Sequence, residues 1–195
     1  MNQPVAGPRA LKRPCPSPAG RERELQDLWA SAYDGWIDVP GDVPTGGTIY
    51  TKPAAEDAAA TAGEASSTPF PSIVTSSHLF ALTGFNPMGE DAPLAENRAA
   101  NARLEAELVS GAFSPTPKAW WRAFGFAKDW REDGFVLAFN PGDAAEAEAA
   151  VVSLAVKYGQ GAIYAYQPIP GEEKTTTCGR CLMTSIFDDV VDGAS

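Results

Sequence analysis

The sequence lacks several features that would assign it to a familiar class of protein. It has no apolar run of 18 residues and no secretory apolar segment, so we expect neither membrane insertion nor secretion. It has one histidine and three cysteines in 195 residues, too few for a disulfide framework. This cysteine usage favours a reducing compartment, either the cytoplasm or the interior of an organelle. The glycine-rich nucleotide-binding motifs and the G-x-S-x-G motif of hydrolases are also absent from the sequence.

Basic residues are few as well. The chain has 15 Lys and Arg against 25 Asp and Glu, which gives a formal net charge of −10. A surface of this sign is repelled by phosphate backbones, so nucleic acid is an unfavourable partner. The hydrophobic content of 44% is sufficient for a folded core. We therefore expect an acidic, soluble protein without a cofactor, whose partner is another protein or a small polar ligand.

Residues 1–71 are predicted to form an N-terminal arm outside the compact domain. The arm is rich in Pro, Ala and Gly at its start, and residues 52–71 read as a low-complexity linker. A short helix is expected from about Glu22 to Tyr33, ended by Gly35, and a brief edge strand from Thr48 to Thr51. The residues before Glu22 include basic side chains and no acidic one, which is compatible with an organelle-targeting signal or with an untargeted flexible arm. These basic residues are Arg9, Lys12, Arg13 and Arg21.

Residues 72–187 are predicted to form the compact domain, followed by an acidic tail at 188–195. Alternation and helical periodicity indicate an α+β fold, a two-layer ferredoxin-like β-α-β-β-α-β sandwich with an extra C-terminal strand. The expected strands are Leu79–Leu82, Ala119–Phe126, Phe135–Phe139, Ala162–Gln167 and Lys174–Phe187. The expected helices follow Asp91 and Asp143 as N-caps and end before Gly111 and Gly159. The inner stripe of the first helix should contain Leu94, Asn97, Asn101, Leu104 and Leu108.

A Phe-Asn-Pro sequence occurs at both strand-to-helix junctions, with Asn86 in the first and Asn140 in the second. We interpret the first and third strands as parallel neighbours, which would place both turns at one end of the sheet beside two helix N-termini. This predicts a polar ligand site containing Asn86, Asn140, Asn97 and Arg98, with Asn101 further along the helix. The alternative is that Asn-Pro is ordinary punctuation between a strand and a helix.

Four segments taken together resemble a known family. They read NP, ENRAANARLEAEL, DWRED-FVLAF and KYGQGAIYAY, and their order and spacing are similar to an uncharacterised, mostly bacterial family, domain-of-unknown-function family 3293. The resemblance covers roughly residues 77–167 and implies a compact domain with no assigned activity. Its pattern falls on Asn86-Pro87, Glu96-Asn97-Arg98, Asn101, Leu104, Leu108, Trp130, Glu132 and Gln160.

Three further features are polar or reactive: Glu132, Gln160 and a pair of cysteines. Glu132 lies in an expected turn, 128–134, where a solvated carboxylate or an acid/base residue would both fit. Gln160 is expected at the opposite end of the second helix from Asn140, in a structural role that binds loop backbone. Cys178 and Cys181 have the spacing of half a zinc site or of a redox pair, although a second pair of ligands is missing.

The leading interpretation is a non-catalytic binding or adaptor domain, with an accessory subunit that docks through its N-terminal arm as one form of it. One rival is a small enzyme that acts on a polar metabolite or nucleotide, with Glu132 or Asp91 as base and with Asn97 and Arg98 orienting the substrate. A second rival is a zinc-dependent interaction module built on Cys178 and Cys181.

Overall fold

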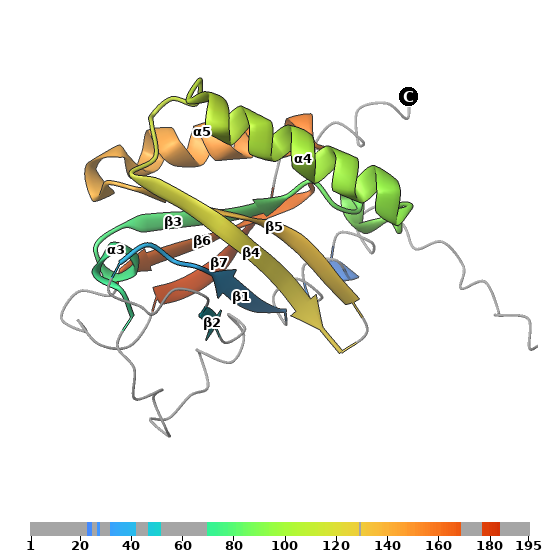
Figure 1. Cartoon of the computed structure of the whole chain (residues 1–195), viewed down its shortest axis with the longest axis horizontal. Coiled ribbons are helices and arrows are strands. Elements are labelled where there is room, and N and C mark those ends of the chain that lie inside the picture. The colour runs from blue at the N-terminus through green and yellow to red at the C-terminus, as the bar shows by residue number, and fades with distance from the viewer. Residues whose placement is uncertain are drawn as a thin grey trace, which may run out of the picture.

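The structure is a computed structural model that describes residues 23, 24, 27, 32–41, 47–51, 70–128, 130–168 and 177–183. Within these residues seven strands form one sheet, in the order β2-β1-β4-β5-β3-β6-β7, and every neighbouring pair is antiparallel (Figure 1). The strands are β1 Tyr33–Ile37, β2 Thr48–Thr51, β3 His78–Thr83, β4 Ala119–Ala127, β5 Trp130–Phe139, β6 Ala162–Pro168 and β7 Thr177–Met183.

Two long helices, α4 (Leu94–Ser110) and α5 (Ala144–Lys157), lie side by side on one face of the sheet (Figure 1). Each is preceded by a short 3-10 turn, Pro87–Gly89 before α4 and Pro141–Asp143 before α5. The apolar faces of the helices pack on alternate residues of the central strands, because residues two apart in a strand share a face. The buried residues of this core include Phe80, Leu104, Leu137, Phe139 and Val151.

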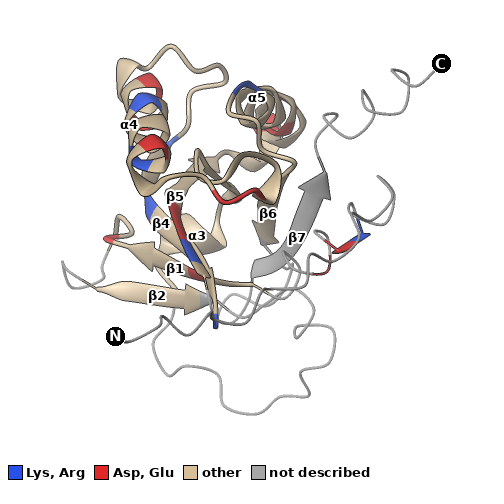
Figure 2. Ribbon diagram, turned by 90° about the vertical axis from the view of Figure 1, so that its right-hand side faces the viewer, with Lys and Arg blue, Asp and Glu red and all other residues tan. Residues whose placement is uncertain are grey.

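The opposite face of the sheet, which we call the concave face, curls around a second core. Trp36 of β1 and Tyr166 of β6 have ring centroids 5.2 Å apart, although β4, β5 and β3 separate their strands in the sheet. In a flat sheet four strand spacings would put them about 19 Å apart. The short helix α3 (Ser72–Thr75) adds Val74 to this core. Figure 2 shows α4 and α5 at the top of the view and β1 and β2, which belong to the same sheet, at the bottom.

The mixed α/β architecture and the predicted order of elements from β3 to β7 are confirmed. The edge strand expected at Thr48–Thr51 is β2, at the end of the sheet. The prediction that residues 1–71 lie outside the compact domain is wrong for β1 and β2, because β1 pairs with β4 from Tyr33↔Phe126 to Ile37↔Arg122. Tyr33 therefore begins a strand and does not end the predicted helix, of which only Arg23, Glu24 and Asp27 are described, in helical conformation.

The predicted parallel arrangement of the first and third strands is wrong. β3 and β5 are antiparallel, with His78 opposite Phe139 and Thr83 opposite Gly134. Asn86 follows Thr83, and Asn140 follows Phe139, so the two asparagines lie at opposite ends of the sheet. The error came from treating two similar strand-turn-helix segments as parallel repeats, whereas the β4–β5 hairpin between them reverses the direction of the second.

The start of α4 also differs from the prediction. Pro93 occupies the N-cap position that was expected for Asp91, and Leu94 is 55% exposed and does not face the sheet. Gly111 ends the helix as predicted, with a left-handed φ of 67°. The long turn predicted at 128–134 is wrong as well, because Trp130 and Glu132 belong to β5.

Several predictions concern residues outside those described. These are the basic N-terminal segment, the linker at 52–69 and the acidic tail at 188–195. The backbone of β7 places Cys178 opposite Gln167 and Cys181 opposite Tyr164, while the cysteine side chains lie outside the described part. None of the described helices is long and apolar enough to cross a membrane.

Candidate functional site

The loop between β3 and α4 is held by asparagine side chains. Asn86 has a left-handed backbone, with φ 44° and ψ 65°, a conformation that Asn tolerates better than most residues. Its Oδ1 accepts the N–H of Ala92 at 3.1 Å and Nδ2 of Asn97 at 2.7 Å. Asn97, which is 5% exposed, accepts the N–H of Asn86 through Oδ1 at 2.8 Å. The two asparagines therefore close the loop onto the first turn of α4.

Two further residues of the family pattern secure the same end of the sheet. Oδ1 of Asn101 accepts the N–H of Gly84 at 2.7 Å, and its Nδ2 donates to the carbonyl of Asp133 at 2.6 Å. Nε2 of the buried Gln160 donates to the carbonyl of Phe85 at 2.8 Å. The predicted backbone-binding role of Gln160 is thus confirmed. Its position next to Asn86 shows that it belongs to the same cluster of polar residues, contrary to the prediction that it would lie apart.

Glu132 joins this network to the concave face. Nδ2 of Asn86 donates to Oε1 of Glu132 at 2.8 Å. Burial raises the pKa of Glu132 above its ordinary value, the hydrogen bond from Asn86 opposes that rise, and the nearby carboxylate of Asp91 adds to it. Glu132 is therefore a carboxyl group held in a fixed orientation and shifted toward its neutral form.

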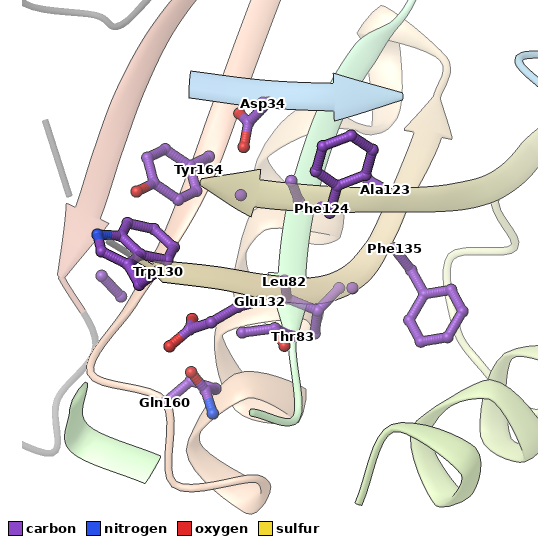
Figure 3. A pocket seen from close by; sticks show the side chains of 14 residues that line it. Asp34, Leu82, Thr83, Ala123, Phe124, Trp130, Glu132, Phe135, Gln160 and Tyr164 are labelled. Atoms are coloured by element: carbon purple, nitrogen blue, oxygen red, sulfur yellow. The ribbon is translucent and has the colours of Figure 1, made fainter. Parts of the chain in front are cut away.

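Beyond Glu132 the concave face contains a hollow (Figure 3). Small residues contribute to its lining, which explains why there is space: Ala81, Ala123, Gly125 and Gly134. Larger side chains, among them Trp130 and Tyr164, surround it, and Gln160 and Thr83 line the part near the asparagine network. The cavity volume is about 50 Å³, enough for about three or four water molecules.

Asp34 of β1 also lines the hollow. It is 6% exposed, and its carboxyl group forms no hydrogen bond or ion pair with any of the described residues. Burial alone raises the pKa of Asp34 to about 7. An isolated carboxyl group is costly to bury, because a polar group without partners loses its hydration. A ligand that donates a hydrogen bond to Asp34 would supply the partner that this carboxyl group lacks.

Asp34 and Glu132 lie in one row across three strands. Asp34 is opposite Gly125 on β4, and Gly125 is opposite Glu132 on β5. Residues directly opposite in antiparallel strands share a face, so both carboxyl groups project from the concave face, about 10 Å apart at the backbone. A Cβ built on Gly125 would lie 3.5 Å from Oδ1 of Asp34 and 3.6 Å from Cη2 of Trp130. The missing side chain of Gly125 therefore leaves a space between a carboxyl group and an indole ring.

The predicted site residues divide into two groups. Asn86, Asn97, Asn101 and Glu132 are brought together, but the three amides form hydrogen bonds with the protein itself, so the amides position the loop. Asn140 lies at the other end of the sheet, where its Nδ2 donates to Asp143 at 3.0 Å. Arg98 is exposed on α4.

The site also contains residues that sequence reasoning missed. Asp34 and Gly125 were not predicted, since no strand was expected at residues 33–37, where the predicted helix ended, and Gly125 was assigned to an ordinary strand position. One signal was present in the segment Tyr33–Ile37, YDGWI. Its alternation places the acidic Asp34 on the same face as the apolar Trp36, which is unusual for a strand that buries that face. Among the described residues there is no group of three or more His, Cys, Asp or Glu that could hold a metal.

Comparison with known proteins confirms the resemblance to an uncharacterised family. Residues 82–163 match the family model described as protein of unknown function DUF3293. This segment contains the whole asparagine network, Glu132 and Gln160, whereas Asp34 precedes it. No curated protein and no solved structure matches the chain.

Proposed function

We propose that this protein, whose central segment carries the pattern of an uncharacterised family, is a binding domain for a small polar ligand. The observation that carries the proposal is the unpartnered Asp34 carboxyl group, 6% exposed, in the lining of the hollow that Glu132 also lines. Proteins pair nearly all of their buried polar groups, and exceptions are concentrated where something else supplies the partner. The ligand would supply the hydrogen bonds that Asp34 lacks.

The asparagine network supports the same proposal. It orders a loop that includes two non-glycine residues at positive φ, Asn86 and Met88. Such backbone conformations cost free energy and persist where the surroundings fix them, often at functional sites. Here the result is that the Glu132 carboxyl group is held by Asn86 in a defined position at the edge of the hollow. We infer that the family pattern on Asn86, Asn97, Asn101 and Gln160 serves to present Glu132.

The size of the cavity favours a small ligand or a small headgroup. About 50 Å³ is well below the volume of a nucleotide-sized site, which is usually several hundred Å³. The proposal also differs from an adaptor that docks through a free N-terminal arm, since β1 and β2 of that segment are part of the sheet. We further infer that the four strands β4-β5-β3-β6, with their two helices, form a ferredoxin-like unit, supported by their order and antiparallel pairing.

A second candidate function is acid/base catalysis, favoured by the two raised carboxyl pKa values. Asp34 at about 7 and Glu132 above its ordinary value would each be able to hold or release a proton near neutral pH. In this case both carboxyl groups would act on one substrate across Gly125. A catalytic role predicts turnover of the bound molecule, whereas a binding role predicts its recovery unchanged.

The test is native mass spectrometry of the full chain after mild purification. We expect a noncovalent adduct of small mass that disappears on denaturation and is depleted in Asp34→Asn. The matched control is Asp133→Asn, an exposed carboxylate next to Glu132 in sequence but on the other face of β5. A full chain that shows no adduct, and whose stability no compound from a broad panel of small polar metabolites raises, would contradict the proposal.

A further inference from the structure

The surroundings of Asp34 limit the kind of ligand that the hollow can accept. Among the described residues that line the hollow, two are charged, Asp34 and Glu132, and both are acidic. Oε1 of Glu132 accepts from Asn86, while Asp34 has no partner. Carboxylates accept hydrogen bonds and attract positive charge. The missing partner is therefore a hydrogen-bond donor, and a cationic donor would compensate the buried negative charge as well.

The absence of a side chain at Gly125 leaves one side of the Asp34 carboxyl group uncovered, and a donor would approach it from there. The position of the absent Cβ lies 3.5 Å from Oδ1 of Asp34 and 3.6 Å from the ring of Trp130. Figure 3 shows Asp34 reaching into the hollow from β1, with Tyr164 between it and Trp130 in this view and the indole nitrogen turned away from Asp34. The donor would thus contact a carboxyl group on one side and an apolar ring edge on the other.

The remaining lining distinguishes an organic cation from a metal ion. Mg²⁺ and Ca²⁺ require about six or more oxygen ligands, and the two carboxyl groups here are separated by two strand spacings. Ala81, Ala123 and the ring of Trp130 supply apolar surface around them. Apolar walls suit the carbon part of an alkylammonium or a guanidinium, whose weakly hydrated faces pack on aromatic rings.

From this geometry we propose that the hollow binds a small organic nitrogen cation, an alkylammonium or guanidinium compound, with its charged group above Gly125 and bonded to Asp34. The inference rests on the proposed ligand-binding function and adds the chemical class of the ligand. Glu132, oriented by Asn86, is the second acceptor on the far side of Gly125. The net charge of −10 adds long-range attraction for a cation, while the apolar walls and the single buried carboxyl supply selectivity.

The experiment is a titration of the full ¹⁵N-labelled chain, followed by NMR at constant ionic strength. The probes are n-butylammonium, methylguanidinium, n-butanol, butyrate and Mg²⁺. We expect the two organic cations to give saturable shifts at the amides of Asp34 and Gly125 and at the Trp130 indole. The neutral alcohol, the anion and Mg²⁺ should not saturate these signals. Asp34→Asn should weaken binding of the cations at least about tenfold, as expected for losing a charge-assisted hydrogen bond, and Asp133→Asn should leave it unchanged.

Each other outcome overturns the inference in a distinguishable way. Saturation by butanol or butyrate at the same signals would contradict the cationic class while supporting a ligand site in the hollow. Saturation by Mg²⁺ in place of the organic cations would assign an inorganic cation. Equal weakening by Asp133→Asn would reduce the effect to general surface charge. If no probe saturates these signals, the cationic class is wrong, and the adduct measurement described above then decides whether the binding function survives.

Discussion

The side-chain amide of Asn86 donates to Oε1 of Glu132 at 2.8 Å and so joins the β3–α4 loop to a carboxyl group that lines the hollow. The same asparagine binds Ala92 and Asn97 through its oxygen. One side chain thus fixes the loop, the start of α4 and a candidate ligand-binding residue. It follows that stability and site geometry depend on Asn86 together.

Replacement of Asn86 by alanine should therefore be costly. Asn86→Ala removes three hydrogen bonds and puts a Cβ-bearing residue without a polar side chain at φ 44°. We expect the free energy of unfolding to fall by about 2–4 kcal/mol, from unsatisfied polar groups and left-handed strain. Asn86→Gly should be more stable than Asn86→Ala by the cost of the left-handed backbone strain alone, because glycine tolerates this conformation but also lacks the three hydrogen bonds. Urea denaturation measures both.

The matched control is Asn140→Ala, in the second Phe-Asn-Pro turn. Asn140 has an extended backbone, is exposed and donates one hydrogen bond to Asp143. Its replacement should cost within about 0.5–1 kcal/mol. The pKa of Glu132 should rise further in Asn86→Ala, because the lost hydrogen bond stabilised its charged form. Equal destabilisation by the two alanine variants would contradict the assigned role of Asn86.

Asp34 should make the stability of the protein dependent on pH. Its ordinary pKa is 3.8 and its folded pKa is about 7, so between these values the folded state holds a proton that the unfolded state has lost. Raising the pH from 4 to 7 should then lower the free energy of unfolding, by up to about 4 kcal/mol at about 1.4 kcal/mol per pKa unit, with no further loss above pH 7. Glu132 contributes in the same direction.

Asp34→Asn should remove most of this dependence, because it keeps the shape of the side chain without its charge. The variant should be more stable than the wild type at pH 8 and close to it only near pH 4, where the carboxyl group becomes protonated in the unfolded as well as in the folded state, as judged by urea denaturation at both values. Asp133→Asn serves as control, since that carboxylate is exposed and paired with Arg131 at 2.9 Å. Parallel stability curves for the wild type and Asp34→Asn would show that Asp34 is not buried without a partner.

Gly125 provides a way to close the hollow without disturbing the fold. A Cβ at Gly125 would meet Asp34 and Trp130 at ordinary van der Waals distances of 3.5 and 3.6 Å. Gly125→Ala should therefore fold with stability equal to the wild type or up to about 1 kcal/mol higher, because glycine weakens a strand. The methyl group would occupy the space proposed for the cation, so binding of n-butylammonium should be lost.

Two other glycines serve as comparisons for this experiment. Gly142→Ala, with nothing within 4 Å of its Cβ, should change neither stability nor binding. Gly134→Ala would place its Cβ 2.5 Å from the carbonyl oxygen of Leu82 and should destabilise the β3–β5 pair. Retained binding in a well-folded Gly125→Ala protein would move the ligand away from this position.

The parts of the fold that depend on local patterns were predictable from the sequence. Helices α4 and α5 and most strands follow from apolar periodicity, because each element buries one face against its neighbours. The β4–β5 hairpin was more difficult to predict. Three of the four residues from Trp130 to Asp133 are charged, so the segment resembles a polar turn unless it is known that Trp130 and Glu132 face one side of a sheet and Arg131 and Asp133 the other. The structure shows that β5 begins at Trp130, with Arg131 and Asp133 exposed.

The candidate site was only half predictable, for a physical reason. Asn86, Asn97, Asn101 and Glu132 stood out because polar residues occur where apolar periodicity or a strand-to-helix turn would not require them. Asp34 could not be connected to them, because its position depends on the pairing of β1 with β4, between segments about 90 residues apart in the chain. Whether Asn86 and Asn140 lie at the same end of the sheet depends on the directions of β3 and β5, which are also set by nonlocal pairing.

The pH dependence of ligand binding should report on Asp34 directly. With a pKa of about 7, the free carboxyl group is about half protonated at neutral pH. A bound organic cation stabilises the charged form, so binding should release about half a proton at pH 7 and almost none at pH 8.5, and the affinity should rise from pH 6 to pH 8. The other titratable groups among the described residues that line the hollow are Glu132 and Tyr164, and Glu132 shares the sign of the effect.

Calorimetry of n-butylammonium binding in phosphate and in PIPES measures this release, because the two buffers differ in their heat of protonation and neither is a net cation that would compete for the site. Asp34→Asn should reduce the difference between the buffers to the contribution of Glu132, and Asp133→Asn should leave it unchanged. If binding took up a proton, the difference in binding heat between the two buffers would have the opposite sign. It would mean that the ligand accepts a hydrogen bond from the neutral acid, and the ligand would then be an acceptor instead of a cationic donor.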